Sequence, residues 1–292
     1  MLAVASWLRR MPSASRPRLA ALIHEGHGLF APPGHPPTVD QAAIMLGVSA
    51  LTSVAPVHRL LVAATSDELA DATARALGRP VPVVPVANPV SRLAPAVPAE
   101  RRTTPSGAIR VALPGVPRPG KNARLLPAVI AAIRTAAADA CILAQVGAKH
   151  APDGDDAMVD LRPGALAEDD YRDMLTNAAI AVLPYDRAHY RARVSGIFVE
   201  AAAAGCVMVV PAGTWMADQL EAGRAAGIVV GDPTPDAIAA AVARAIAELP
   251  ALSATALAKS AQWREGYGPG PFIARIEELM DGPTGGGPAS SA

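Results

Sequence analysis

The chain has 292 residues, and its 26 Lys and Arg are balanced by 26 Asp and Glu, so the formal net charge is zero. This length predicts about two domains. The balanced charge argues against a nucleic-acid-binding protein that works through a large basic surface. Hydrophobic residues make up 51% of the chain and aromatic residues only 3%. The apolar residues are therefore mainly aliphatic, which excludes disorder over most of the chain and favours helices packed on buried strands.

Three features bear on the cellular compartment. The two cysteines, Cys141 and Cys206, lie in apolar runs, and their number excludes a disulfide framework or a Cys-based zinc site, so we expect buried thiols. The longest uncharged stretches, residues 41–57 and 201–217, are interrupted by Gly and Pro and predict no transmembrane segment. The N-terminal arginines follow the apolar patch, which is the wrong order for a secretory signal. We expect a cytoplasmic protein, with peripheral attachment at the inner face of the membrane as a variant of this prediction.

The first part of the chain has an irregular α/β pattern. Strands are predicted at residues 19–23, 59–64 and 81–86, with helices at 39–46 and from a capped start at 65–68. These elements are too few for a complete doubly wound domain. Residues 95–108 are rich in Pro, charge and small polar residues and predict a linker.

The second part alternates regularly. The predicted strands are residues 108–113, 141–146, 158–161, 180–183, 206–210 and 228–230, and the predicted helices are 123–138, 167–176, 196–204 and 235–248. Strands that alternate with crossover helices predict a parallel, doubly wound sheet whose strands end at one common edge. The predicted fold class is α/β with two Rossmann-like lobes, of which only the C-terminal one is complete. The domains would be residues 1–97, a linker at 98–107, residues 108–270, and a C-terminal helix with a disordered tail at 271–292.

A Gly- and Pro-rich loop, residues 114–122 (PGVPRPGKN), lies between a predicted strand and a predicted helix. Gly115 allows close backbone approach to a ligand, and the following helix N-terminus favours anions. Arg118 and Lys121 add two cations, which is a suitable arrangement for a diphosphate. The alternative is a solvated loop with ordinary surface charges.

The same loop nearly matches a Walker A sequence. Asn122, however, stands where Ser or Thr must coordinate magnesium. Pro117 and Pro119 also remove backbone N–H groups that a phosphate cradle needs. These departures argue against a P-loop nucleotidase, which remains the weakest alternative.

A second motif covers residues 190–200 (YRARVSGIFVE). Ser195 is a suitable N-cap for a helix. The first amides of that helix have no intrahelical partner and would point at a second anion site. These amides belong to Gly196, Ile197 and Phe198.

Glu200 is the sole acidic residue in the stretch 194–217, which is otherwise mostly apolar. An unpaired carboxylate in such surroundings would be costly. A sugar diol is one partner that satisfies both oxygens, and an ion pair with Arg191 or Arg193 is the other. Further along the predicted helix 167–176, Tyr171, Met174 and Leu175 share one face and predict core packing.

Together, these motifs resemble a known family. The run 108–230 resembles the C-terminal, donor-binding domain of GT-B glycosyltransferases, of the retaining type that includes glycosyltransferase family 4. The resemblance rests on ALPGVPRPGK and SGIFVEAAAAGCVMVVPAGTW. The stretch HRLLVAATSDELADATARALGRPVPVVPVANP resembles the end of the partner N-terminal domain in such enzymes.

The resemblance implies a role for each matched residue. Arg118 and Lys121, with Gly115 beside them, would bind the diphosphate of a nucleotide sugar. The amides of residues 196–198 would hold its distal phosphate, and Glu200 would bind the ribose hydroxyls. The sequence departs from the family at Ala192, where a second Glu is typical, and Tyr190 or Arg193 would then contact the donor sugar. The N-terminal domain is also shorter than the family requires.

A third motif, His24-Glu25-Gly26-His27, follows a predicted strand. Its spacing is not that of a zinc-binding HExxH helix, and the glycine argues against a helix here, so no metal site is predicted. GT-B enzymes often present a His from a strand end of the N-terminal domain near the transferred sugar, and His24 or His27 resembles that residue. The alternative is a pair of exposed loop histidines.

The resulting prediction is a glycosyltransferase that moves a hexose from a nucleotide-diphosphate sugar with retention. It requires no cofactor. The acceptor, whether glycan, lipid or small molecule, is not specified, and no nucleic-acid partner is expected. The alternative is a non-catalytic remnant of such an enzyme that still binds nucleotide sugars.

Overall fold

The computed structural model describes residues 2–12, 17–24, 39–54, 60–88, 90, 93–94, 96–147, 156–162 and 164–281. The chain divides into two compact units. The smaller unit contains residues 1–87 and 269–292, and the larger unit contains residues 88–268. His27 lies outside the described residues, as does the predicted disordered tail beyond Asp281.

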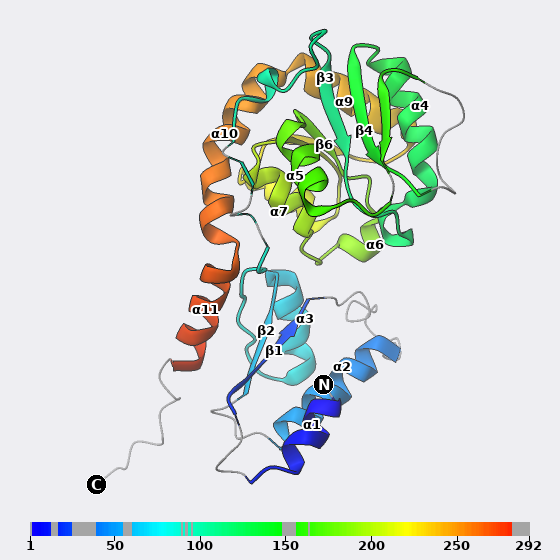
Figure 1. The fold of residues 1–292 in the computed structure, drawn as a ribbon. Helices are drawn as coiled ribbons and strands as arrows, with labels where there is room; N and C mark the ends of the chain where they lie inside the picture. The colour runs from blue at the N-terminus through cyan, green and yellow to red at the C-terminus, as the bar shows by residue number, and fades with distance from the viewer. Residues whose placement is uncertain are drawn as a thin grey trace. The chain divides into compact units, whose positions relative to one another are not determined.

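The larger unit is built on a parallel sheet of six strands (Figure 1). The strands are β3 (Ile109–Leu113), β4 (Ala140–Gln145), β5 (Val159–Arg162), β6 (Ile180–Val182), β7 (Val207–Pro211) and β8 (Gly227–Val230). Their spatial order is β5-β4-β3-β6-β7-β8, and each neighbouring pair is parallel. This arrangement confirms the predicted doubly wound sheet.

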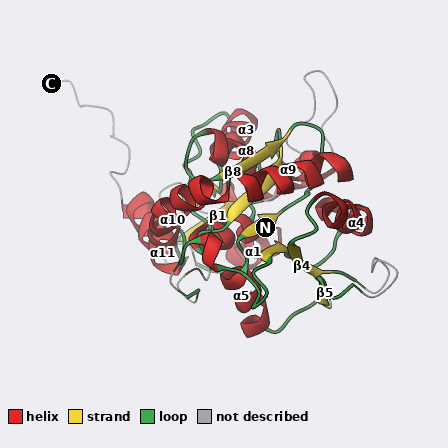
Figure 2. Cartoon of the chain, turned by 90° about the horizontal axis from the view of Figure 1, so that it is seen from above, coloured by secondary structure: helices red, strands yellow, loops and turns green. Residues whose placement is uncertain are grey.

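Helices cover both faces of this sheet (Figures 1 and 2). On one face, α4 (Leu126–Ala136) and α9 (Pro235–Ala247) pack together over alternate strand residues such as Val111, Ile142 and Val209, which are fully buried or nearly so. On the other face lie α5 (Glu168–Asn177) and α7 (Gly196–Ala203). The shorter helices are α6 (Arg187–Tyr190) and α8 (Trp215–Glu221), and the long α10 (Leu249–Gly266) packs against α7.

The smaller unit contains a two-stranded parallel sheet. It pairs β1 (Leu19–Ile23) with β2 (Leu60–Ala64), and the helices are α1 (Leu2–Arg9), α2 (Val39–Thr52), α3 (Asp67–Leu77) and α11 (Pro269–Asp281). Ser66 caps α3 as its sequence predicts, and Gly78 ends it with a φ of 65°. The predicted strand at 81–86 is reduced to a single bridge between Ala64 and Val83. Helix α11 belongs to this unit, where Asp281 forms an ion pair of 2.6 Å with Arg18.

The segment predicted as a linker, residues 98–107, is instead part of the larger unit. It forms a short 3-10 helix, η5 (Ala99–Arg101), which packs on α10. Arg102 follows and is only 3% exposed. Its guanidinium donates to the backbone oxygens of Ala178, at 2.8 Å, and Val97, at 2.7 Å, and also to that of Ala204 at the end of α7. These bonds hold the segment against the sheet, so it does not behave as a free linker.

Within the described residues, no single helix is long and apolar enough to cross a membrane. Helices α9 and α10 together have the length and composition of a span, but the pair is bent by 86° at its break. Across the same residues, no group of three or more His, Cys, Asp or Glu side chains is arranged to hold a metal ion.

Candidate functional site

The topology of the larger sheet selects one position for a ligand. Strand β3 lies between β4 and β6, so the chain leaves β3 towards β4 on one side and returns in β6 on the other. The loops that follow β3 and β6 therefore diverge and open a crevice at the carboxyl edge of the sheet. The loop after β3 is the predicted diphosphate loop, residues 114–122, and the loop after β6 leads to the second predicted motif.

Backbone and side-chain bonds fix the loop after β3. Gly115 has a φ of 109°, which favours glycine, and its N–H donates to Oε1 of the buried Gln145 on β4. The loop then forms a 3-10 turn, η6 (Pro119–Lys121), and Asn122 adopts the left-handed conformation with a φ of 52°. The Asn122 side chain donates to the backbone oxygen of Pro184 at 2.8 Å, which ties this loop to the one after β6.

The two predicted motifs meet at Gly115. A Cβ added there would lie 2.5 Å from Nζ of Lys121 and 2.5 Å from Cδ1 of Ile197 in the first turn of α7. The Tyr185 hydroxyl would be 3.3 Å away, and in the structure it donates to the backbone oxygen of Pro114. Residues about 80 positions apart in the sequence therefore line one small volume.

Lys121 is the electrostatic centre of this volume. Burial, reinforced by the positive charges of Arg118 and Arg193, lowers the pKa of Lys121 from 10.5 to about 8, while the Glu200 carboxylate acts in the opposite direction. Its ammonium also lies 5.3 Å from the centre of the Tyr185 ring. Three cations thus gather around one carboxylate, and an anionic ligand would relieve the repulsion between them.

Glu200 has a partner that the sequence did not reveal. The Tyr171 hydroxyl on α5 donates to Oε2 of Glu200 at 2.6 Å, so the hydrogen-bond partner is Tyr171 and not Arg191 or Arg193. Burial raises the pKa of the Glu200 carboxyl, and the Tyr171 bond and the Lys121 charge act against that rise. The prediction that Tyr171 packs in the core is therefore wrong for its hydroxyl end. Met174 and Leu175 are buried as predicted.

The start of α7 differs from the prediction at one amide. Ser195 is the N-cap, and its hydroxyl accepts the Phe198 N–H at 3.2 Å, so that amide does not point at an anion. The Phe198 ring is fully buried and packs edge-on against Trp215 and Trp263. The amides of Gly196 and Ile197, at the helix start, have no intrahelical partner and remain the candidates for phosphate contact. Asn88, which is 8% exposed, lies beside Gly196.

Tyr190 and Arg193, the residues predicted to replace the missing second Glu, lie against each other, and Tyr190 also lies against Tyr185. Tyr190 is buried, and its ring centre lies 4.6 Å from that of Tyr185. The Arg193 guanidinium lies over the Tyr190 ring, 5.4 Å from its centre. Ala192, where the family has a Glu, is also buried. Tyr190 therefore supports Arg193, and whether either contacts a donor sugar stays a prediction.

A cavity of about 330 Å³ lies beside the loop after β3. Its walls include Arg118, Lys121, Gln145, Leu166, Tyr171 and Ile197. This volume is at the lower end of the range for small-molecule sites. The cavity is thus lined by cations from one loop, the first turn of α7 and an aromatic side chain from α5.

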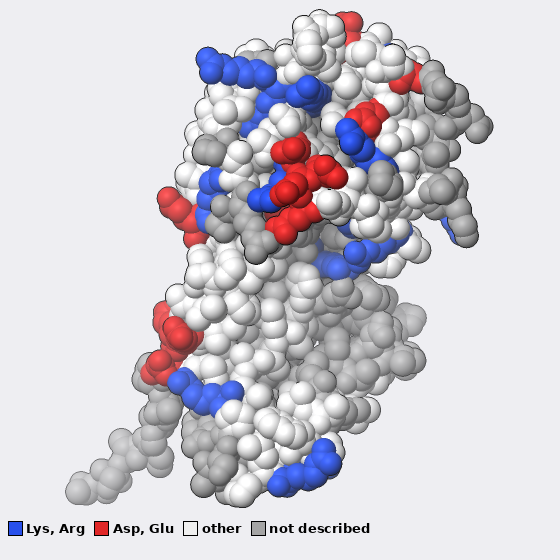
Figure 3. All heavy atoms as spheres, viewed as in Figure 1, with Lys and Arg blue, Asp and Glu red and all other residues white. Residues whose placement is uncertain are grey.

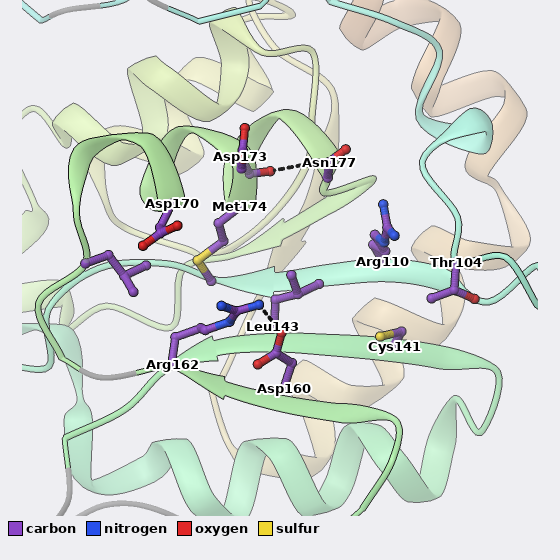
Figure 4. Close-up of a pocket in the computed structure, with 11 residues that line it drawn as sticks. Thr104, Arg110, Cys141, Leu143, Asp160, Arg162, Asp170, Asp173, Met174 and Asn177 are labelled. Atoms are coloured by element: carbon purple, nitrogen blue, oxygen red, sulfur yellow. Dashed lines mark hydrogen bonds and ion pairs between the residues drawn. The ribbon is translucent and has the colours of Figure 1, made fainter.

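A second cavity of about 310 Å³ lies between α5 and the β3-β4-β5 part of the sheet (Figure 4). Cys141 lines it and is half-buried, so the prediction of two buried thiols holds for Cys206 only. Asp160 and Arg162 in its wall form an ion pair with each other at 2.5 Å. None of the predicted donor-binding residues lines this cavity, so the candidate site is the first one.

On the side drawn in Figure 3, Lys and Arg groups are interspersed with Asp and Glu groups. Acidic groups gather near the position of α5 in Figure 3. The first turn of α5 carries Glu168, Asp169 and Asp170. Acidic residues at a helix start are stabilised by the macrodipole.

In the smaller unit, His24 follows β1 directly. Its Nδ1 lies 3.2 Å from the Thr65 hydroxyl, which follows β2, so the two residues meet at the carboxyl edge of the small sheet. This is the edge at which the sequence places a functional histidine, and the role itself stays a prediction.

Comparison with solved structures identifies the architecture. Sucrose-phosphate synthase from Thermosynechococcus elongatus matches with a TM-score of 0.64 and 16% identity, over 95% of this chain and 70% of that one. HepE from Anabaena, in complex with UDP-glucose, matches with a TM-score of 0.59 and 16% identity, over 91% and 72%. WaaG, a glycosyltransferase involved in lipopolysaccharide biosynthesis, matches with a TM-score of 0.55 and 12% identity, over 84% and 68%. The chain has the GT-B glycosyltransferase fold.

At these identities the matches establish the fold alone. The larger unit corresponds to a complete GT-B lobe, whereas the N-terminal lobe is incomplete, with a two-stranded sheet in its described part. No protein-family model matches the sequence, and the search of curated proteins also gives no match.

Proposed function

We propose that the larger unit binds a nucleotide-diphosphate sugar and that the protein transfers its hexose to an acceptor with retention of configuration. The observation that carries this proposal is the environment of Lys121. A largely buried ammonium stands among two arginines and beside a carboxylate that is itself hydrogen-bonded to a hydroxyl. A diphosphate linked to a sugar diol would neutralise the cations and satisfy the carboxylate together. HepE, which shares the fold, has been solved with UDP-glucose.

The chemistry follows from where negative charge develops. When the bond between the sugar and the diphosphate breaks, charge increases on the departing phosphate oxygens. Arg118 and Lys121 would stabilise that charge from one side. The Gly196 and Ile197 amides at the start of α7 would act from the other, with the helix macrodipole. In this proposal, these groups supply the charge that a metal ion supplies in other transferases.

A non-catalytic protein that binds nucleotide sugars is the second candidate. Ala192 favours it, because the buried methyl group stands where the family has a donor-contacting carboxylate. Release of free sugar from UDP-glucose by the purified chain distinguishes the enzyme from the non-catalytic protein. Slow hydrolysis requires a competent transfer site, whereas a protein that only binds the nucleotide sugar releases no sugar.

Isothermal titration with UDP and GDP tests the shared part of both candidates. Lys121→Ala and Glu200→Ala should each weaken binding of the preferred nucleotide at least tenfold, or about 1.4 kcal/mol. Lys259→Ala, on α10 in the same unit, removes an equal charge outside the cavity and should leave the affinity unchanged. Unchanged affinity in both Lys121→Ala and Glu200→Ala would remove the site assignment.

A further inference from the structure

Tyr171 connects two walls of the candidate site. It lies on α5 and lines the cavity, and its hydroxyl donates to Glu200 on α7 at 2.6 Å. Helices α5 and α7 also pack directly against each other. The sequence assigned Tyr171 to the core, and no step of the proposed chemistry uses it.

The donor end of this bond lies at the cavity, and the acceptor Glu200 lies directly behind it in the hydrogen bond. Tyr171 and Lys121 both line the cavity, and Lys121 acts electrostatically on the same Glu200 carboxylate. Oε2 of that carboxylate accepts the Tyr171 hydroxyl, and Oε1 has no hydrogen bond within the described part of the chain. An ionised carboxylate accepts hydrogen bonds at both oxygens, so Oε1 is the acceptor that a ligand hydroxyl would use.

The length of the bond indicates its strength. Hydroxyl–carboxylate bonds of about 2.5–2.7 Å are charge-assisted and roughly twice as strong as neutral ones. Such a bond fixes the rotamer of Glu200 and favours its ionised form, against the burial that raises the pKa of this carboxyl. Without the phenol, the buried carboxylate would keep only the influence of Lys121 and would take up a proton more readily.

We propose that Tyr171 is a positioning residue for Glu200, holding Oε2 so that Oε1 accepts the ribose 2′-hydroxyl and the site selects ribonucleoside diphosphates over their 2′-deoxy forms. This inference rests on the proposed function and extends it to the selection of the nucleotide's sugar. Tyr171 acts through Glu200 and does not take part in the transfer itself.

Titration calorimetry with UDP and 2′-deoxy-UDP tests the proposal on four proteins: the wild type, Tyr171→Phe, Glu200→Gln and the double variant. The wild type should prefer UDP by about tenfold. Tyr171→Phe should lose about three- to tenfold in UDP affinity and little in 2′-deoxy-UDP affinity, so that the preference largely disappears. The double variant should match Glu200→Gln, because the phenol has no separate effect once the carboxylate is gone.

The pH dependence supplies a readout that a purely structural role would not change. In Tyr171→Phe the pKa of Glu200 should rise further, so UDP affinity should fall between pH 8 and pH 6 more steeply than in the wild type. Tyr267→Phe, at the end of α10, removes a hydroxyl elsewhere in the same unit and should follow the wild type. Trp fluorescence establishes that each variant is folded. If Tyr171→Phe does not fold, loss of the UDP preference in Glu200→Gln still tests the selection.

Three outcomes would overturn the inference. Equal losses for UDP and 2′-deoxy-UDP in Tyr171→Phe would show a structural role, and additive losses in the double variant would show that Tyr171 does not act through Glu200. Tighter UDP binding by Tyr171→Phe would show that the phenol competes with the ligand. Failure of the proposed function looks different, because the wild type would then bind neither UDP nor GDP.

Discussion

Replacement of Lys121 by Met should change stability and binding in opposite directions. The pKa of Lys121 is lowered from 10.5 to about 8, first by burial and then by Arg118 and Arg193. Each pH unit of difference between the folded and unfolded pKa corresponds to about 1.4 kcal/mol. At neutral pH the charged ammonium therefore destabilises the ligand-free fold by about 3 kcal/mol, as an order of magnitude. The same charge would attract a diphosphate.

Lys121→Met keeps an unbranched side chain and removes the charge. We expect the free energy of unfolding of the ligand-free protein to rise by about 1–3 kcal/mol at pH 7, while UDP affinity falls at least tenfold. Urea unfolding with and without UDP measures both effects. Fluorescence from Trp215 and Trp263, which lie in the larger unit, reports on the part of the chain that contains the site. Lys259→Met is the matched control and should change neither quantity.

The pH dependence gives the sign of the effect independently. Because the folded pKa of Lys121 lies below the unfolded one, the unfolded chain holds more protons between pH 8 and pH 10.5. The wild type should therefore gain stability relative to Lys121→Met as the pH rises through this window. The difference between their free energies of unfolding should become smaller. A variant that is less stable than the wild type by an amount independent of pH, with unchanged UDP affinity, would refute the reasoning.

Two further substitutions test other parts of the larger unit. Gly115→Ala places a methyl group 2.5 Å from the Lys121 ammonium at a φ of 109°, so we expect a loss of about 1–3 kcal/mol in stability and about tenfold in UDP affinity, measured by urea unfolding and calorimetry. Gly231→Ala, where the added methyl meets nothing within 4 Å, is its control, and equal behaviour of the two would contradict the steric argument. Arg102→Met removes the guanidinium donor from the backbone oxygens of Ala178 and Ala204, in buried bonds, and from that of Val97, in a partly buried one. It should lower the free energy of unfolding, measured by urea, by about 3 kcal/mol with UDP affinity unchanged. A surface-like response, below about 0.5 kcal/mol, would show that these bonds are replaced by water.

The larger sheet was predictable because its signals are local. The strand predicted at 108–113 is observed at Ile109–Leu113, and the one at 180–183 at Ile180–Val182. Continuous aliphatic runs of this length bounded by Gly or Pro are typical of buried parallel strands. The helix predicted from residue 123 starts at Leu126, because residues 123–125 form a 3-10 turn after the left-handed Asn122. Boundary errors of this kind arise from single backbone angles that periodicity does not specify.

The segment around Arg102 was wrongly predicted for a tertiary reason. A Pro-rich stretch with two arginines is typical of a solvated linker, yet Arg102 is buried and binds carbonyl groups that lie about 75 and 100 positions further along the chain. Arg264 makes similar bonds to the backbone oxygens of Ala203 and Leu93. Composition shows that an arginine is charged. Composition does not show whether the folded chain places that arginine next to backbone carbonyl groups that lack a donor at the end of a helix or strand.

In the candidate site, residue spacing predicts which side chains of α5 share a face but not which of them are buried in the core. Helical spacing correctly groups Tyr171 with Met174 and Leu175 on one face of α5, and the latter two are buried. The face, however, extends from the core to the edge of the cavity, and Tyr171 occupies the cavity end. Periodicity gives the direction of a side chain around the helix axis. It does not show how far along the helix the neighbouring elements cover that face. Glu200 is the residue of the sequence that points to this bond, because a buried carboxylate in an apolar helix requires a hydrogen-bond donor. The Tyr171 hydroxyl on α5, which packs on the same face of the sheet as α7, is that donor.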